Sequence, residues 1–346
     1  MDIADYKLDG RADVVEFCPH HPYHNVLAAA TYTLHEGDKP HRSGSISLFS
    51  ACSVTGLQLL QVVQTMGIFD MKWNPNERLL NPMLAQVDSD GCLSLYSLKS
   101  NEATEACGGA MLKPVGSENI SSAMCLCLDW SPSSTSISLG LSDGSVSMAT
   151  LAESEIHVSQ SWKAHDYEVW STLIDYHQPQ LLYTGSDDCR FCCWDLRDTP
   201  PNSVFRNTKS HKMGVCCIAK NPSNPNMVLT GSYDESLRVW DVRSVSKPVD
   251  ECSINLGGGV WRIKYHPDNP DLVLAACMHN DFAIIRIGKN DDITVIEKYK
   301  KHESLAYGAD WQRSCRDRNE SSCLVATCSF YDNTMRIWIP QNLSPA

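Results

Sequence analysis

The sequence predicts an all-β fold, a seven-bladed β-propeller in which a strand from the N-terminus completes the last blade. Three observations predict this fold: a phrase that recurs seven times, its regular spacing, and a spare strand pattern at the start of the chain. The clearest copy of the phrase, SYDESLRVWD, covers residues 232–241. The position of its Trp240 is occupied in the other copies by Phe49, Tyr96, Ala149, Trp194, Ile285 and Trp338, so neighbouring copies lie 45 to 53 residues apart.

Each copy contains the pattern of one four-stranded blade. A polar turn leads into about five residues of alternating character, as a hairpin turn leads into a half-buried strand. Two further apolar runs precede the turn, and the first of them ends in an aromatic residue such as Trp73 or Trp130. With the connection to the next copy, this pattern predicts blades over residues 12–63, 66–115, 123–161, 165–207, 211–254, 258–299 and 302–340. The period is typical of Trp-Asp (WD40) repeats.

The two ends of the chain are expected to close the ring. Residues 3–8 have a strand pattern outside the seven copies, and the chain stops soon after the strand of Trp338. We expect residues 3–8 to form the outer strand of the last blade, which removes an exposed sheet edge. Because seven blades account for nearly all of the 346 residues, we expect a single domain and a monomer.

Composition limits the partners and the location of the protein. The formal charge of −12 argues against nucleic acid, because binding to phosphates requires concentrated Lys and Arg. No stretch approaches the ~20 apolar residues that cross a bilayer, and no secretory signal precedes the first blade. Most of the 16 Cys residues fall in expected strands, where a thiol behaves as a small buried hydrophobe. We expect a cytoplasmic protein with no membrane or nucleic-acid partner.

Two patterns resemble catalytic or metal motifs. Residues 140–144 match the G-x-S-x-G phrase of a nucleophile elbow, but they are expected at a turn between strands, whereas the elbow joins a strand to a helix. Cys189 and Cys192 have the spacing of half a zinc site, which needs a second pair. We therefore expect no nucleophile at Ser142, no metal and no cofactor.

A repeated histidine is predicted to be structural. His165 and His211 each stand 29 residues before a Trp, at Trp194 and Trp240. In this kind of propeller the His, a strand hydroxyl, the Trp and a turn Asp form a buried hydrogen-bonded chain. His302 precedes Trp338 by 36 residues, so a longer loop is expected in the last blade at residues 313–322.

The sixth copy departs from the pattern at its turn. Residues 277–281, CMHND, replace the usual polar turn and place His279 on the rim around the central channel. An imidazole near a carboxylate can act as a general base. The alternative is a variant turn capped by Asn280 or Asp281.

Large side chains stand at the starts of several expected inner strands, where a propeller needs only small apolar residues. Trp170, Trp261 and Tyr307 are expected on the same rim, with Asp70 as a carboxylate near the channel. Aromatic faces beside acids suit a quaternary ammonium ligand, through cation–π attraction. The alternative is packing between neighbouring blades.

The chain resembles the Trp-Asp repeat diphthine methylesterases of eukaryotic diphthamide biosynthesis. The resemblance rests on residues 302–311 (HESLAYGADW), 259–262 (GVWR) with the following 265–267 (YHP), 278–281 (MHND), and 169–171 leading into 183–188. It covers residues 160–340, and the first three blades match more loosely.

The resemblance implies a carboxylic ester hydrolase that acts on translation elongation factor 2. Its substrate there is diphthine methyl ester, which carries a trimethylammonium group, and hydrolysis releases methanol. No catalytic triad is visible by spacing. Our hypothesis is that His279 activates water or a nearby nucleophile, that Asp310 orients it, and that Arg262 or the amides of residues 257–259 stabilise the oxyanion.

The rival interpretation is a non-catalytic interaction platform, because a fold does not give a function. Residues 194–197 (WDLR) and 240–243 (WDVR) resemble the box by which substrate receptors dock on the adapter of cullin–RING ubiquitin ligases. The alternative is that Arg197 and Arg243 each pair with an acid of a neighbouring strand. The two functions can coexist in one chain.

Overall fold

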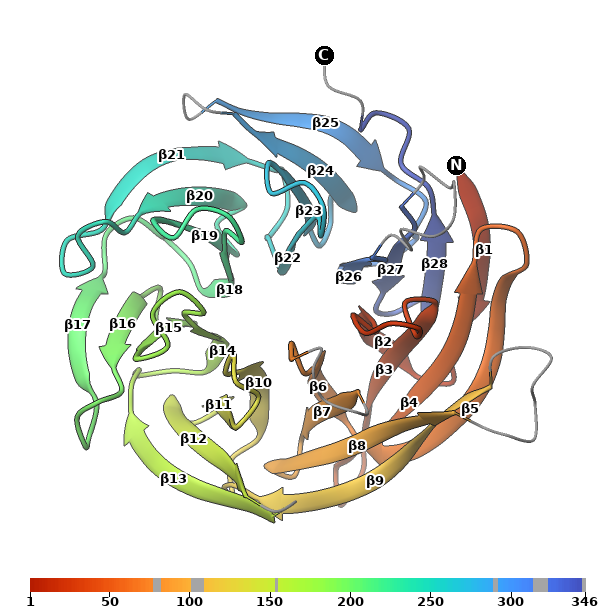
Figure 1. The fold of residues 1–346 in the computed structure, drawn as a ribbon, viewed down its shortest axis with the longest axis horizontal. Coiled ribbons are helices and arrows are strands. Elements are labelled where there is room, and N and C mark those ends of the chain that lie inside the picture. Colours follow the sequence, from red (N-terminus) through yellow and green to blue (C-terminus); the bar gives the residue numbers. More distant parts are fainter. Residues whose placement is uncertain (77–81, 101–108, 153–154, 289–291, 314–322, 344–346) are drawn as a thin grey trace.

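A computed structural model describes residues 1–76, 82–100, 109–152, 155–288, 292–313 and 323–343. In these residues the chain forms seven four-stranded antiparallel sheets arranged as blades around a central channel (Figure 1). The predicted seven-bladed propeller is confirmed. The described residues contain no helix that is long and apolar enough to cross a membrane.

The blades follow one another along the chain, each running from an inner strand next to the channel to an outer strand. The first three blades are β2 (Arg11–Phe17), β3 (Val26–His35), β4 (His41–Cys52) and β5 (Gly56–Met66); β6 (Ile68–Trp73), β7 (Met83–Asp88), β8 (Cys92–Ser100) and β9 (Ala110–Asn119); and β10 (Cys125–Trp130), β11 (Ser136–Leu141), β12 (Ser145–Ala152) and β13 (Glu155–Lys163). The next three are β14 (Val169–Ile174), β15 (Leu181–Ser186), β16 (Phe191–Asp195) and β17 (Asn202–Asn207); β18 (Val215–Lys220), β19 (Met227–Ser232), β20 (Ser236–Asp241) and β21 (Val249–Asn255); and β22 (Arg262–Tyr265), β23 (Leu272–Ala276), β24 (Phe282–Ile287) and β25 (Ile293–Tyr299).

The last blade joins both ends of the chain. It consists of β26 (Ala306–Trp311), β27 (Val325–Ser329), β28 (Thr334–Trp338) and the N-terminal strand β1 (Asp2–Lys7). β1 pairs antiparallel with β28, with Tyr6 opposite Met335. The predicted closure by the N-terminus is therefore confirmed. The longer loop expected at residues 313–322 falls, after Arg313, outside the described residues.

Buried apolar side chains fill the spaces between neighbouring blades. Alternate residues of each strand point to opposite faces of the sheet, so each blade contributes to the two clusters on either side of it. Trp240 and Trp338, two of the repeated aromatics, are completely buried. Burial of such a side chain contributes on the order of 2–3 kcal/mol.

The predicted histidine network is present in the fourth and fifth blades. His165 Nε2 lies 2.7 Å from Thr184 Oγ1, and its Nδ1 lies 3.0 Å from Asp188. Trp194 Nε1 donates to the same Thr184 hydroxyl at 2.9 Å. The equivalent groups around Trp240 are connected in the same way. These side chains hold strands of one blade together and are structural.

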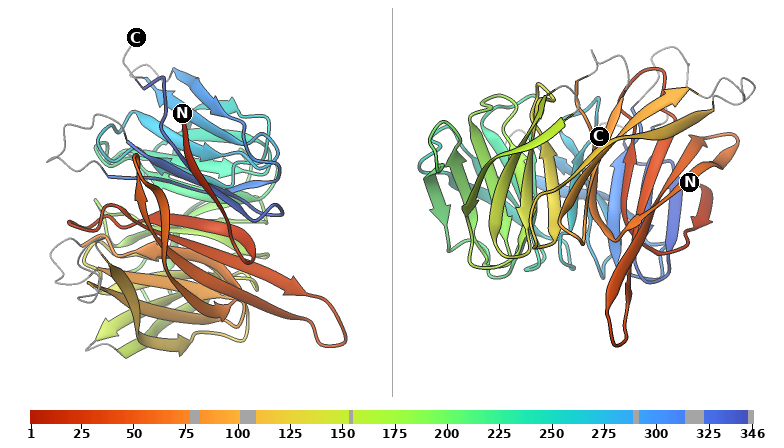
Figure 2. Two further views of the ribbon diagram at one scale, coloured as in Figure 1. Left: turned by 90° about the vertical axis from the view of Figure 1, so that its right-hand side faces the viewer. Right: turned by 90° about the horizontal axis from the view of Figure 1, so that it is seen from below.

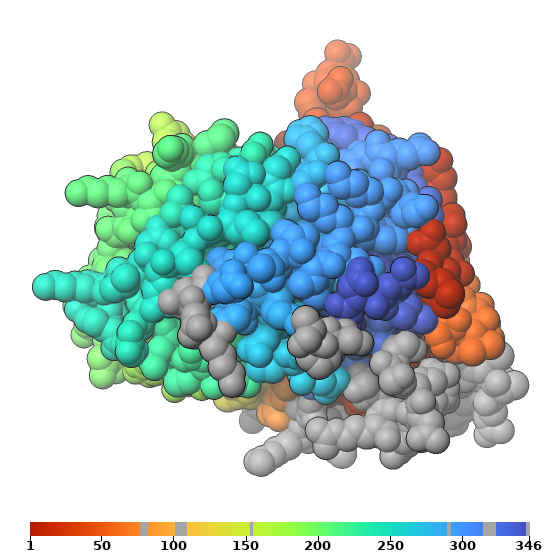
Figure 3. All heavy atoms as spheres, turned by 90° about the horizontal axis from the view of Figure 1, so that it is seen from above, coloured from red at the N-terminus to blue at the C-terminus, as the bar shows by residue number. Residues whose placement is uncertain are grey.

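One hairpin extends beyond the rim of the propeller. β3 and β4 continue their pairing out to His35 opposite His41, and the hairpin stands clear of the body (Figures 2 and 3). The two imidazole rings stack at 4.5 Å between centroids. Residues 34–44 thus form an arm of the first blade.

Candidate functional site

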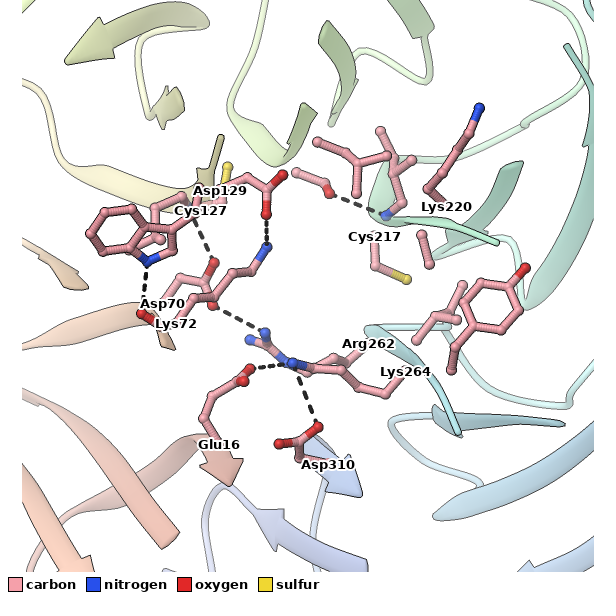
Figure 4. A pocket seen from close by; sticks show the side chains of 18 of the residues that line it. Glu16, Asp70, Lys72, Cys127, Asp129, Cys217, Lys220, Arg262, Lys264 and Asp310 are labelled. Atoms are coloured by element: carbon pink, nitrogen blue, oxygen red, sulfur yellow. Dashed lines mark hydrogen bonds and ion pairs between the residues drawn. The ribbon is translucent and has the colours of Figure 1, made fainter. Parts of the chain in front are cut away.

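The central channel contains a cavity of about 680 Å³ that all seven blades line. Its lining extends from Trp170 and Trp261, at the start of inner strands, to prolines just beyond the ends of inner strands, such as Pro75 and Pro267. The cavity therefore runs along the length of the inner strands. Figure 4 shows the side chains that face it.

Charged side chains gather on one half of the channel wall. Five of the seven inner strands carry a charged residue immediately before their final aromatic: Glu16, Lys72, Asp129, Lys264 and Asp310. Asp70 and Arg262 also line the cavity, two residues before Lys72 on β6 and two before Lys264 on β22. These seven side chains come from the first, second, third, sixth and seventh blades.

The charges pair across the channel. Lys72 Nζ lies 3.1 Å from Asp129 Oδ1, and Arg262 Nη1 lies 3.0 Å from Asp70 Oδ1. Lys264 Nζ donates to Glu16 Oε1. Figure 4 shows the three cations pointing towards the channel axis, between the acids. These seven side chains thus place four carboxylates beside three cations, and Lys220 and Arg313 also line the cavity.

Burial and neighbouring charges shift these groups in different directions. Burial raises the pKa of Glu16 to about 7, although Lys264 opposes the shift. Burial also raises the pKa values of Asp310 and Asp129. Asp70 differs: burial alone would raise its pKa, but Arg262 and Lys72 hold it below the usual value. The site therefore contains a carboxyl group that exchanges a proton near neutral pH, beside fixed positive charges.

The other half of the wall carries uncharged residues at the equivalent strand positions. Ser171 and Leu173 of β14 and Cys217 and Ala219 of β18 occupy the positions that carry charges elsewhere. Burial raises the pKa of the Cys217 thiol, and its Sγ donates to the Val260 carbonyl. A protonated thiol is a poor nucleophile. This half therefore suits apolar parts of a ligand.

Aromatic rings close the inner end of the channel. The rings of Trp170 and Trp261 are 5.3 Å apart, and Trp261 stacks on Tyr307 at 4.8 Å. Tyr307 in turn contacts Phe330 at 5.0 Å. Trp170 Nε1 and Arg262 Nε are buried donors that have no hydrogen-bond partner in the described residues. Both residues line the cavity.

The structure brings together most of the residues that the sequence singled out. Arg262 and Asp70 form an ion pair, and Asp310 faces the same cavity. Trp170 and Trp261 line the cavity; Tyr307 packs behind Trp261, so packing between blades accounts for its position.

His279 does not join this group. Its exposed side chain lines a separate hollow of about 350 Å³ on the rim, with His302, Ser304 and Tyr331 among its neighbours. The constellation of His279 with Asp310 and Arg262 is thus not assembled, because His279 lines the hollow on the rim whereas Asp310 and Arg262 line the central cavity. Residues 257–259 also lie outside the cavity lining.

Glu16, Lys72, Asp129 and Lys264 were missed at the sequence level. A signal for them was present, because a charged residue immediately before the final aromatic of an inner strand recurs in five blades. All five of these side chains line the channel. Glu16 is buried and the other four are partly exposed, so a charge that recurs at this position indicates a wall that faces the channel rather than packed core.

The two Trp-Asp-x-Arg phrases have a local explanation. Arg197 pairs with Asp195 and Arg243 with Asp241, two residues earlier in each case. The side chains of both arginines are 72% exposed. They therefore pair within the chain and remain accessible.

Residues 157–195 and 202–241 match the family described as "WD domain, G-beta repeat". The whole chain is similar to a protein named diphthine methyltransferase homolog from Dictyostelium discoideum, 33% identical over 96% of this chain and 97% of the relative. It is also 34% identical to the diphthine methyltransferase of Mus musculus, over 87% of this chain and 67% of the relative, and 31% identical to that of Schizosaccharomyces pombe, over 97% and 96%. A shorter stretch, 25% of this chain, is 31% identical to 12% of the Arabidopsis thaliana E3 ubiquitin-protein ligase COP1.

Solved structures share the fold at low sequence identity. A chain in the crystal structure of the mitotic checkpoint complex superimposes with a TM-score of 0.71 and 15% identity, over 98% of this chain and 94% of that chain. Sqt1 from Chaetomium thermophilum gives a TM-score of 0.69 and 17% identity, over 100% and 85%. At such identities the similarity shows the propeller fold alone.

Proposed function

The chain belongs to the diphthine methyltransferase family of WD-repeat proteins, which takes part in diphthamide biosynthesis, and on that premise we propose that it hydrolyses the methyl ester of diphthine methyl ester in its central channel. The protein substrate is translation elongation factor 2, and the products are the diphthine carboxylate and methanol. The proposed location is the cytoplasm, where translation takes place.

One observation carries the choice of hydrolysis: four carboxyl groups and three cations face one another in the channel, and burial raises the pKa of one of the carboxyl groups, Glu16. Hydrolysis of an ester needs a base that activates water and positive or hydrogen-bonding groups that stabilise the oxyanion. Glu16, Asp310 and Asp129 are candidate bases, and Arg262, Lys72 and Lys264 supply the positive charge.

The shape of the channel matches the proposed substrate. Diphthine is a long extension of a histidine side chain, and a narrow cavity of about 680 Å³ accepts a side chain rather than a folded surface. The Trp170 and Trp261 rings at the inner end offer faces to its trimethylammonium group. In this proposal His279 has no part in the chemistry, and Asp70 is occupied by Arg262 instead of contacting the ligand cation.

The test is direct. Purified protein is incubated with elongation factor 2 that carries diphthine methyl ester, and the mass of the modified peptide is followed. We expect the loss of one CH2 from the peptide and the appearance of methanol in equal amount. An unchanged peptide mass, with a substrate that a positive control confirms as methylated, would refute the proposal.

A second candidate is docking to the adapter of a cullin–RING ligase. It is favoured by the exposure of Arg197 and Arg243, which project from consecutive blades. Co-purification of the adapter with the wild-type protein, and its loss from the Arg197→Ala/Arg243→Ala double variant, would support this role. Equal recovery with both proteins would count against it.

A further inference from the structure

We infer that Glu16 is the general base that removes a proton from the attacking water in the channel. This inference rests on the proposed ester hydrolysis and identifies the residue that carries it. Of the four channel carboxylates, Glu16 alone accepts no backbone amide within the described part of the chain; its Oε1 accepts from Lys264 Nζ.

The other three carboxylates are fixed to the backbone of the next blade. Asp129 Oδ2 accepts the Ile174 amide at 2.8 Å, and Asp310 Oδ2 accepts the Phe17 amide at 2.7 Å. Asp70 Oδ2 accepts the Leu128 amide at 3.1 Å. Ser171 makes the same kind of bond to the Ile218 amide at 3.1 Å. These acceptors join neighbouring inner strands, so protonation or movement of the acids would weaken the ring.

Glu16 occupies the same strand position as Asp129 and Asp310 but does not make this bond. The equivalent partner would be the amide of Trp73, and no bond between Glu16 and that amide is present in the described residues. The Glu16 carboxylate turns instead to the other side of β2, towards Lys264 of β22, and Lys264 Nζ donates to its Oε1. The backbone of Glu16 is held separately, because Trp73 Nε1 donates to its carbonyl at 3.2 Å.

The groups around Glu16 suit a base that must exchange a proton. Lys264 and Arg262 face it from β22, Lys72 from β6 and Asp310 from β26. Burial and the Asp310 charge favour the protonated carboxyl, while the cations favour the carboxylate. The balance raises the pKa of Glu16 to about 7, which is near the optimum for a base that works at neutral pH.

In the proposed hydrolysis Glu16 takes a proton from water and later passes it to the leaving methoxy group. Water attacks the ester carbon while one of its protons passes to the Glu16 carboxylate, and the carbonyl π electrons move to the oxygen. Collapse of the tetrahedral intermediate breaks the bond to the methoxy oxygen, which takes the proton from Glu16 and leaves as methanol. The product acid then releases its own proton to solvent.

Buried donors are available for the developing oxyanion. Arg262 Nε has no partner in the described residues, although Arg262 Nη1 is bound to Asp70. Trp170 Nε1 is also free of a described partner. A donor that is fixed by other contacts and unpaired in the resting protein stabilises charge without reorganisation.

The experiment compares single-turnover hydrolysis by the wild type with that by Glu16→Gln across pH. In the wild type the rate should rise with pH through a value near 7, since the base must be deprotonated. Glu16→Gln should lose on the order of 10²- to 10⁴-fold in rate together with this pH dependence. Glu16→Asp should also lose activity, because its side chain has the length that binds a backbone amide at Asp129 and Asp310.

Controls separate the possible failures. Glu297→Gln removes a carboxylate on the outer strand β25, which accepts the Gln341 and Asn342 amides, and should keep the wild-type rate. Thermal unfolding and binding of the methylated substrate show whether Glu16→Gln is folded and competent to bind. An inactive wild type would refute the proposed hydrolysis itself. An active wild type with a Glu16→Gln variant that keeps the rate and the pH profile would refute only the assignment of Glu16.

Discussion

Acidification from pH 7 to pH 5 should destabilise the propeller through His302 of the last blade. His302 corresponds to His165 and His211, but its surroundings differ. Its Nε2 lies 2.9 Å from Thr327 Oγ1, and its Nδ1 lies 2.5 Å from Ser329 Oγ, which itself donates to Asp332. In the fourth and fifth blades Nδ1 meets the turn Asp directly. Ser329 therefore separates the His302 ring from the carboxylate.

The size of the stability loss follows from the difference between the His302 pKa in the folded chain and that in the unfolded chain. Burial lowers the pKa of His302 from 6.5 to about 4, and the more distant Asp332 only partly opposes the shift. Between these values the unfolded chain binds a proton that the folded chain does not, so stability falls as the pH falls. At pH 7 both forms are mostly neutral. Linkage then gives a loss of about 2 kcal/mol in the free energy of unfolding between pH 7 and pH 5.

The assay is urea unfolding at pH 7 and pH 5 of the wild type, His302→Asn and His279→Gln. His302→Asn lacks the titrating ring, so its stability should fall by about 2 kcal/mol less than that of the wild type over this range. His279→Gln retains His302 and serves as the control, with the wild-type difference. Equal pH dependence of the wild type and His302→Asn would refute the reasoning.

Three further changes test other parts of the molecule. Trp73→Phe removes the hydrogen bond from the indole to the Glu16 carbonyl, a bond that contributes about 1 kcal/mol to stability. Steady-state kinetics of hydrolysis should then show a lower kcat and a displaced pH profile, with KM little changed. Lys220→Met leaves the buried Asp175 carboxylate without its cation at 2.7 Å, which should cost about 3–5 kcal/mol of unfolding free energy in urea. A second change, Asp175→Asn, removes the charge but keeps an oxygen for the His177 and Gln178 amides, so it should restore most of that loss. Gly144→Ala requires a φ of +85° and places a Cβ 2.4 Å from a backbone carbonyl of the loop that enters the fourth blade, so thermal unfolding should show a loss of more than about 1 kcal/mol.

The scaffold was predictable because its causes are local and repeated. A turn with Asp, a strand that ends in Trp and a His at fixed spacing each satisfy their own hydrogen bonds within one blade, as His165 and Trp194 do. The same pattern in seven copies fixes the number of blades. Even the difference at His302 has a local cause, because Ser329 stands between the ring and Asp332.

The candidate site was predictable only in part. Trp170, Trp261, Arg262 and Asp70 were found because each departs from what a propeller requires at its position. His279 departs from the pattern too, but on the rim, and a repeat pattern does not distinguish the rim from the interior of the channel. An unusual residue in one blade is therefore weaker evidence of a site than a charge that recurs at one position in several blades.

Which channel charges pair depends on where their blades lie in the closed ring, and not on how far apart the residues are in the sequence. Glu16 and Lys264 are 248 residues apart, yet closure of the ring leaves only the last blade between their blades. Within that geometry the direction of the side chain decides what each acid does. At the same strand position, Asp129 and Asp310 accept an amide of the next blade and join the ring, whereas Glu16 turns to the other side of its blade and pairs with Lys264. A carboxylate that is not bound to the next blade thus arises at a position that otherwise serves to join blades.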